Sequence, residues 1–190
     1  MPSTGCRKIL IEMDSEPTLA YISLGSNLGD RAGNLLLAVR GLIEADLVVH
    51  RLSTIYETEP IDMDTDLKFL NMVAEVQIGA ATPTQLMARL LRIEYSLGRG
   101  EKHAGPKEPR TIDLDIIFIG SVKLNTDLVT VPHPRMHLRK FVLRPLVELI
   151  PNFVHPILKT EVVELLAASE DTSAVHRWSP NPRAKGETAT

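Results

Sequence analysis

The sequence predicts an α+β fold in which helices cover one face of an antiparallel sheet. The first observation is the order of its segments, in which apolar strand-like runs alternate with amphipathic helical runs as strand, helix, strand, strand, helix, strand. The second is size, because 190 residues with 44% hydrophobic composition suffice for one core. Two split βαβ halves of this kind form a ferredoxin-like βαββαβ sandwich, to which a C-terminal hairpin and helices are added.

A local sequence pattern predicts each element of the first half. Residues 19–24 read Leu-Ala-Tyr-Ile-Ser-Leu, a strand that stops at the turn Gly25-Ser26-Asn27. The helix expected over 31–45 carries its large apolar residues on one side. Residues 47–58 and 68–78 are both strand-like, and we expect them to pair in antiparallel fashion.

The second half begins with a helix signal. Thr82-Pro83-Thr84-Gln85 combines an N-cap residue, a proline at the first helical position and a capping-box glutamine, so a helix is expected over 83–96. The glycine at 98 ends it. The apolar run 110–119 predicts a strand, and 122–131 predicts a small hairpin.

The C-terminal part predicts two further helices, one over 138–149 that Pro145 breaks and a short one over 161–168. Polar composition predicts disorder at the C-terminal end. We divide the chain into an N-terminal extension over 1–18, a single domain over 19–169 and a disordered C-terminal tail over 170–190.

Composition excludes several classes of protein. A formal net charge of −3 and a pI near 6.1 argue against a nucleic-acid binder. Cys6 is the only cysteine, which excludes an intramolecular disulfide and favours a reducing compartment. No run reaches the ~18 apolar residues of a membrane span, and the N-terminus lacks a signal-peptide core. We therefore expect a cytoplasmic protein, acting as a monomer and binding neither nucleic acid nor membrane.

The run 110–119 reads Arg-Thr-Ile-Asp-Leu-Asp-Ile-Ile-Phe-Ile and places two carboxylates in an otherwise apolar strand. Strand geometry puts Asp113 and Asp115 on one face and Leu114 on the other. At ~6 Å and an effective dielectric near 20 the two charges repel by about 3 kcal/mol, so a cation should lie nearby. Oxygen ligands of this kind suit Mg²⁺ and hence phosphate chemistry. The other explanation is an edge-strand pair of aspartates that faces solvent or is satisfied by arginines.

Basic residues are dense between Arg92 and Arg110, in a loop that contains three glycines. A solvated turn is the ordinary explanation of such a charge run. Because the loop leads into the candidate metal strand, it also fits a phosphoryl-transfer site with a lid over 100–108. His133 and His137 lie four residues apart, but the prolines around His133 and the lack of an evident third ligand favour anion binding over zinc.

Asn71 is a polar residue in an otherwise apolar strand. Its side chain either hydrogen-bonds to the backbone or hydrogen-bonds to the edge of a heterocyclic ligand, for which an amide offers both a donor and an acceptor. Gly25-Ser26-Asn27 is only a weak candidate for a phosphate loop, because the lysine of a P-loop is missing; a turn into the helix is the alternative.

Together these segments resemble the 6-hydroxymethyl-7,8-dihydropterin pyrophosphokinase family over about residues 19–155. The matching pieces, in the family's order, are Tyr-Ile-Ser-Leu-Gly-Ser-Asn-Leu-Gly-Asp (21–30), Tyr56-Glu57-Thr58-Glu59-Pro60, Phe69-Leu70-Asn71, residues 94–99, Pro-Arg-Thr-Ile-Asp-Leu-Asp (109–115) and Val-Pro-His-Pro-Arg-Met (131–136). Each piece is short, and their combination carries the resemblance.

The resemblance implies a Mg²⁺-dependent diphosphotransferase of folate biosynthesis, which transfers pyrophosphate from ATP to hydroxymethyl-dihydropterin without a covalent enzyme intermediate. Asp113 and Asp115 match the ligands of two Mg²⁺ ions, and with Arg110 and Arg139 they make up the implied catalytic residues. The implied pterin-binding positions are Thr58, Ile61, Phe69, Asn71 and Phe141, with the two phenylalanines sandwiching the ring. The implied ATP-binding positions are Arg110, Ile116, Thr130, His133 and Arg139.

The chain departs from the family pattern just before the aspartates. Lys107-Glu108-Pro109 places a glutamate where the family has a glycine, and no aromatic residue stands nearby. This departure bears on loop closure and turnover. Two alternatives stay open: another two-metal nucleotide transferase, such as a nucleotidyltransferase, and a pterin- or nucleotide-binding module of the same fold with weakened catalysis.

Overall fold

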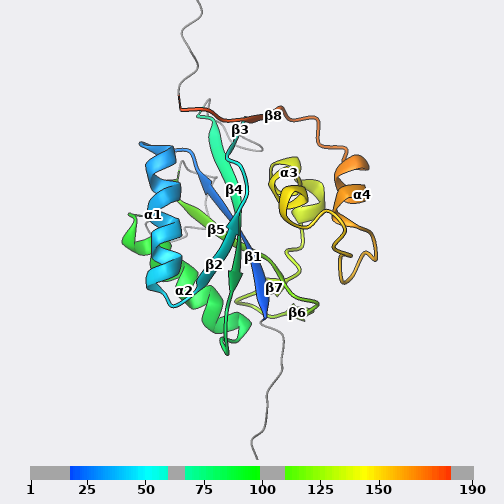
Figure 1. Ribbon diagram of the computed structural model, residues 1–190, viewed down its shortest axis with the longest axis horizontal. Coiled ribbons are helices and arrows are strands. Elements are labelled where there is room, and N and C mark those ends of the chain that lie inside the picture. Colours follow the sequence, from blue (N-terminus) through cyan, green and yellow to red (C-terminus); the bar gives the residue numbers. More distant parts are fainter. Residues whose placement is uncertain (1–17, 60–66, 99–109, 181–190) are drawn as a thin grey trace, which may run out of the picture.

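The computed structural model describes residues 18–59, 67–98 and 110–180, arranged as in Figure 1. The strands are β1 (Leu19–Ser26), β2 (Val48–Leu52), β3 (Tyr56–Thr58), β4 (Phe69–Gln77), β5 (Asp113–Ile119), β6 (Leu124–Asn125), β7 (Thr130–Val131) and β8 (Val175–Arg177). The helices are α1 (Arg31–Glu44), α2 (Pro83–Ser96), α3 (Lys140–Leu149) and α4 (Val162–Ala167), with a 3₁₀ turn over Met136–Leu138. Most of the expected N-terminal extension, Ile61 and the expected lid over 100–108 lie outside these ranges.

The main sheet confirms the predicted fold class. Among the described residues it has six strands in the order β5-β1-β4-β3-β8, with β2 also paired to β4. All of these pairs are antiparallel. One detail differs from the prediction, because the run 47–58 forms two strands: β2 pairs with residues 74–77 of β4, and β3 pairs with residues 69–71. The expected hairpin is formed by β6 and β7.

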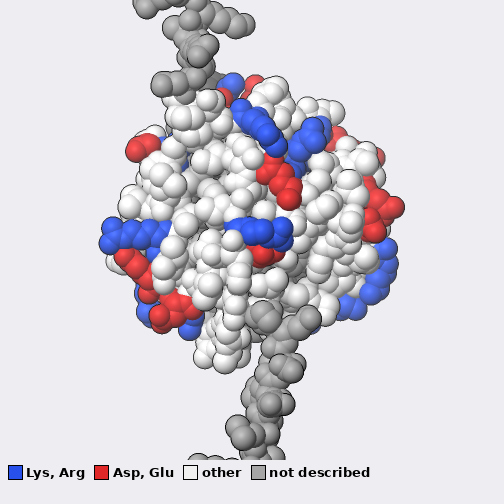
Figure 2. All heavy atoms as spheres, viewed as in Figure 1, with Lys and Arg blue, Asp and Glu red and all other residues white. Residues whose placement is uncertain are grey.

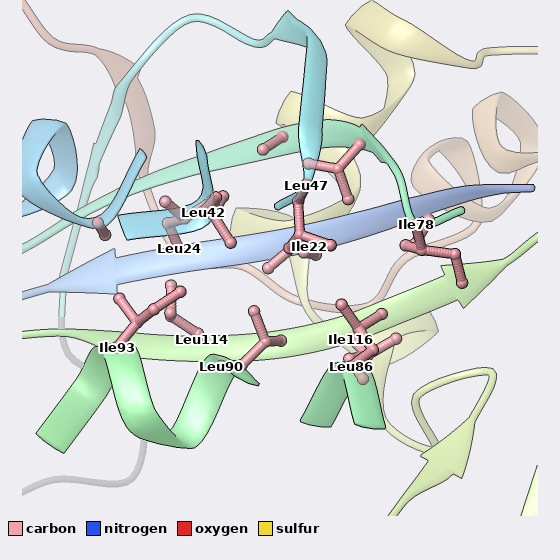
Figure 3. Packing of buried hydrophobic residues seen from close by; sticks show 14 of the residues in the cluster. Ile22, Leu24, Leu42, Leu47, Ile78, Leu86, Leu90, Ile93, Leu114 and Ile116 are labelled. Atoms are coloured by element: carbon pink, nitrogen blue, oxygen red, sulfur yellow. The ribbon is translucent and has the colours of Figure 1, made fainter. Parts of the chain in front are cut away.

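Helices α1 and α2 cover one face of this sheet (Figure 1). Figure 3 shows how their apolar side chains join those of the strands, with Leu42 of α1 beside Leu24 of β1 and Leu90 of α2 beside Leu114 of β5. The predicted capping box of α2 is present: Thr82 Oγ1 accepts from the Gln85 N–H at 3.3 Å, and Gln85 Oε1 accepts from the Thr82 N–H at 2.9 Å.

Helix α3 covers part of the opposite face. Its Leu143 and Leu146 are buried in a second cluster with Tyr21, Val73 and Phe118 of the sheet, and α4 packs on the outer side of α3 (Figure 1). The part of this face where β1 ends and where β4 and β5 begin carries polar side chains, among them Ser23, Asn71 and Asp113.

Two expectations about the C-terminal part are wrong. Pro145 does not break the helix, because α3 runs through it with Pro145 buried, and this burial offsets the hydrogen bond that a proline cannot donate. The expected disordered tail over 170–190 is also wrong as far as residue 180, because Val175–Arg177 form β8 along β3. Residues 181–190 lie outside the described ranges.

The surface of the described residues carries mixed charges. Figure 2 shows acidic and basic side chains in small mixed groups on the face that it displays. Ion pairs within the described residues include Arg40 with Glu44 of α1, at 2.7 Å, and Arg31 with Glu57, at 2.9 Å. None of the helices within 18–59, 67–98 and 110–180 has the length and apolar character needed to cross a bilayer.

Candidate active site

The two aspartates of β5 lie as the strand pattern predicts. Leu114 is buried in the core on the side of α1 and α2, whereas Asp113 and Asp115 align with Gly25 and Ser23 of β1 and face the opposite side. Both aspartates are half-buried, and 25% of the Asp113 side chain is exposed. A cation from solvent can therefore reach the pair.

Arg110 supplies one cation at this place. Its Nη1 donates to Asp113 Oδ2 at 3.0 Å, so part of the alternative explanation, in which an arginine satisfies the aspartates, is present. The two aspartates also present carboxylate oxygens on one half-buried face of the strand, and such oxygens are the ligands that Mg²⁺ prefers.

Two buried polar side chains fix the backbone around the aspartates. Asn27 Oδ1 accepts from the Arg110 N–H at 2.6 Å, and the Asn27 N–H donates to the Arg110 carbonyl at 3.1 Å. Glu94 of α2, only 2% exposed, accepts from the Leu114 N–H at 2.7 Å through Oε1. Glu94 thus holds the one residue that lies between the two aspartates.

Sequence reasoning missed both of these supporting residues. The sequence offers only a weak phosphate-loop role for Asn27, because its bonds to Arg110 join positions 83 residues apart. The signal for Glu94 was available, because its carboxylate falls on the buried face of an amphipathic helix, where an unpaired charge is rarely tolerated.

A second polar group lies two strands away from Asp113. Asn71 of β4 aligns with Gly25 of β1, and Gly25 aligns with Asp113 of β5. Because neighbouring strands are ~4.8 Å apart, the backbones of Asn71 and Asp113 are separated by about 10 Å. Asn71 Nδ2 donates to Thr58 Oγ1 at 2.8 Å, which orients the amide, and Phe69 aligns with Thr58 in the same strand pair.

The segment that leads into α3 lies beside β5, where the His133 N–H donates to the Ile117 carbonyl at 3.0 Å, and it carries basic and aromatic side chains. Arg139 Cζ is 5.6 Å from the centre of the Phe141 ring, a cation–π distance. Burial, followed by the charges of Arg139 and Arg135, lowers the pKa of His133 to about 4, with Asp113 acting in the opposite direction. His133 is therefore neutral at pH 7, and the arginines carry the positive charge that an anion would meet here.

Two of the residues predicted to bind the nucleotide have side chains that are engaged within the protein itself. The Ile116 side chain is buried in the core with α1 and α2, so a contact with a nucleotide there is left to its main chain. Thr130 lies in the hairpin, where its Oγ1 donates to Asn125 Oδ1 at 2.8 Å. The predicted pterin residue Ile61 lies outside the described residues.

The donor set of the site suits magnesium better than zinc. In the described part of the chain, no three His, Cys, Asp or Glu side chains are grouped so that they could hold a metal ion, and zinc at His133 and His137 thus finds no third ligand there. Mg²⁺ needs no complete cage of side chains, since it keeps several waters and is commonly held by one or two carboxylates together with substrate phosphates. Asp113 and Asp115 fit that requirement.

Comparison with known proteins indicates the family of the chain. Residues 21–151 match the family model described as 7,8-dihydro-6-hydroxymethylpterin-pyrophosphokinase (HPPK). The chain is 43% identical over 162 residues to the 2-amino-4-hydroxy-6-hydroxymethyldihydropteridine pyrophosphokinase of Bacillus subtilis, covering 84% of this chain and 90% of that protein. It is 35% identical over 145 residues to the protein of the same name from Aquifex aeolicus, covering 76% and 88%.

Other similar proteins are much longer than this chain. The folic acid synthesis protein fol1 of Pneumocystis carinii is 40% identical over 137 residues, which are 72% of this chain but 18% of that protein. A crystal structure of wild-type Plasmodium falciparum HPPK-DHPS with pteroate superposes with a TM-score of 0.63 at 14% identity, over 80% of this chain and 44% of that one, and this likeness supports the fold alone. On the family match and the two bacterial relatives, the chain belongs to the 7,8-dihydro-6-hydroxymethylpterin-pyrophosphokinase family.

Proposed function

We propose that the chain transfers the pyrophosphate group of ATP to 6-hydroxymethyl-7,8-dihydropterin and releases AMP, as a step of folate biosynthesis. The observation that carries this proposal is the row Asp113, Gly25 and Asn71 across β5, β1 and β4. It sets carboxylates suited to a cation about 10 Å from an amide suited to a heterocycle. A pterin held by Asn71 can then extend its hydroxymethyl group past Gly25 toward phosphates at the aspartates.

The pterin side of the site binds and orients the acceptor. The bond from Asn71 Nδ2 to Thr58 Oγ1 fixes which amide atoms face the ring, and such a fixed amide distinguishes donors from acceptors on a heterocycle. Phe69 and Phe141 would stack on the two faces of the pterin and exclude water from it. The family resemblance also assigns Ile61 to pterin binding.

The phosphate side of the site holds ATP. Asp113 and Asp115 would hold two Mg²⁺ ions, which when bound neutralise the phosphate charge and orient the reacting groups. Arg110 and Arg139 position the phosphates, and His133, Thr130 and the main chain of Ile116 lie on the nucleotide side. The hydroxymethyl oxygen attacks the β-phosphorus and loses its proton, the bond from that phosphorus to the oxygen of the α-phosphate breaks, and AMP leaves.

The deciding experiment identifies the products of the purified chain with ATP, Mg²⁺ and hydroxymethyl-dihydropterin by ³¹P NMR and mass spectrometry. We expect AMP and pyrophosphorylated pterin in equal amounts, and no AMP when either pterin or Mg²⁺ is omitted. Release of free pyrophosphate with an adenylylated acceptor would indicate a nucleotidyltransferase instead. Binding of both substrates without any product would indicate the catalytically weakened module.

We also propose that the enzyme acts in the cytoplasm as a monomer. A single cysteine at position 6 is in keeping with a reducing compartment. Gel filtration that gives a mass near 21.0 kDa would support the monomer, and twice that mass would contradict it.

A further inference from the structure

The C-terminal segment from Ser169 to Trp178 joins two parts of the site that are distant in sequence. It lies beyond residues 21–151, which match the family model. Figure 1 shows the chain leaving α4, passing the end of α3 and reaching β3 as strand β8. One end of the segment is attached to the start of α3 and the other to β3, so it spans the two elements that carry Phe141 and Thr58.

The first attachment caps α3. The preceding residue, Arg139, makes no side-chain cap bond of its own. The Lys140 N–H instead donates to Asp171 Oδ2 at 2.8 Å, and Lys140 Nζ donates to the Asp171 carbonyl at 3.1 Å. A carboxylate at this end of a helix also meets the positive end of the helix dipole. Because Lys140 lies between Arg139 and Phe141, Asp171 fixes the backbone that presents both residues.

The Asp171 carboxylate is itself held in place. Its Oδ1 accepts from the Ser173 N–H at 2.8 Å, and the Asp171 N–H donates to Ser169 Oγ at 3.3 Å. Burial alone raises the pKa of Asp171, but the hydrogen bonds of Ser173 and Lys140 and the charge of Lys140 outweigh it and hold that pKa below its ordinary value. The charged cap is thus present at neutral pH.

The second attachment closes the sheet beside β3. Thr58 aligns with Val175 and Tyr56 aligns with Arg177 in the antiparallel β3–β8 pair. Arg177 Nη2 donates to Glu148 Oε1 at 2.9 Å, and the Tyr56 hydroxyl donates to the same oxygen at 2.6 Å. Glu148 lies in the last turn of α3, so β3, β8 and both ends of α3 form one connected unit.

We propose that residues 169–178 act as a clamp for pterin binding, with Asp171 as its positioning residue. The clamp contacts no substrate; it fixes the wall formed by Thr58 and Asn71 relative to the wall formed by Phe141. The proposal rests on the proposed function, because it takes these residues to bind the pterin. Strands β3 and β8 lie beyond β4 and β1 from the two aspartates on β5, whereas the cap at Lys140 also holds the backbone of Arg139 on the phosphate side. Nucleotide binding therefore depends on the clamp less than pterin binding does.

The test compares Asp171→Ala with Glu170→Ala, a neighbouring exposed carboxylate, in the full chain. Loss of a helix cap typically changes an equilibrium constant by roughly five- to tenfold. We therefore expect Asp171→Ala to raise the Kd and KM for hydroxymethyl-dihydropterin by that factor and, because Arg139 shares the capped backbone, to raise the Kd of an ATP analogue by a smaller factor of about two. Glu170→Ala should match the wild type, and Asp171→Asn should recover part of the loss because its amide oxygen still accepts from Lys140.

Equal losses for pterin and ATP, or a pterin Kd in Asp171→Ala equal to that of Glu170→Ala, would overturn the clamp. If Asp171→Ala fails to fold, Asp171→Asn and Val175→Pro, which disturbs the β3–β8 pair, are measured in the same way, and unchanged pterin Kd values in both overturn it. The proposed function is judged separately on the wild type. A wild type without pterin-dependent AMP release contradicts the function, whereas an active wild type with unaffected variants contradicts only the clamp.

Discussion

Gly25 lies directly opposite Asn71 in the β1–β4 pair, so closely that a Cβ atom at position 25 would come within 3.1 Å of Asn71 Oδ1 and 3.9 Å of Phe69 Cδ1. The first distance is shorter than ordinary van der Waals contact. We predict that Gly25→Ala turns the Asn71 amide away from its bond to Thr58 and weakens pterin binding about tenfold, an amount typical of modest overpacking. Calorimetric titration of the variant with pterin would measure this.

Titration with an ATP analogue serves as the internal control for Gly25→Ala. The added methyl group faces Asn71 on β4, and the expected ATP affinity is within twofold of the wild type. A pterin affinity that is unchanged would show that the amide adapts without cost, and the close approach would then have no role in binding.

Asn71→Ala removes the amide itself. We expect it to weaken pterin binding by roughly 10- to 100-fold, because a polar edge of the ligand then loses its partners in a buried place, and to leave ATP binding nearly unchanged. Thr58 Oγ1 also loses its donor, so unfolding by urea should show a loss of about 1 kcal/mol. Asn152→Ala, at an exposed asparagine, is the matched control, and equal weakening of pterin and ATP binding would speak against the assigned role.

The parts of the fold and of the site that the sequence predicts are those that depend on local sequence patterns. Strand alternation places Asp113 and Asp115 opposite Leu114, and the Thr82 capping box needs only neighbouring residues. The role of Asp171 cannot be predicted in this way, because its contact with Lys140 spans 31 residues. The prediction that Pro145 breaks the helix is wrong for the same reason, since the burial that keeps α3 intact comes from its tertiary neighbours.

Asp115→Asn tests the metal role of the aspartate pair. The substitution keeps size and shape but removes one of the two charges proposed to hold Mg²⁺, and losses of electrostatic stabilisation of this kind lower kcat by roughly 100- to 1,000-fold. Steady-state AMP release at saturating substrates measures it, with circular dichroism to verify folding. Asp127→Asn, in the exposed hairpin turn, should be as active as the wild type, and near-normal turnover of Asp115→Asn would falsify the metal assignment.

The pKa of His133 gives a prediction about stability and pH. Burial and the nearby arginines lower that pKa to about 4 in the folded protein, whereas an unfolded chain binds the proton near pH 6.5. Between these values the unfolded state binds more protons, so the stabilisation present above pH 6.5 is lost as pH falls and is fully lost below about pH 4. At pH 5, about 1.5 units below the unfolded value, the loss is about 2 kcal/mol.

Urea unfolding at pH 7 and pH 5 would measure this loss, with His133→Gln as the comparison. The wild type should lose about 2 kcal/mol more between the two pH values than His133→Gln does, because the variant lacks the titrating ring. His176→Gln, at an exposed histidine of β8, should behave like the wild type. The same pH dependence in the wild type and His133→Gln would mean that His133 titrates normally, and the positive charge beside the phosphates would then include the imidazole below about pH 6.5.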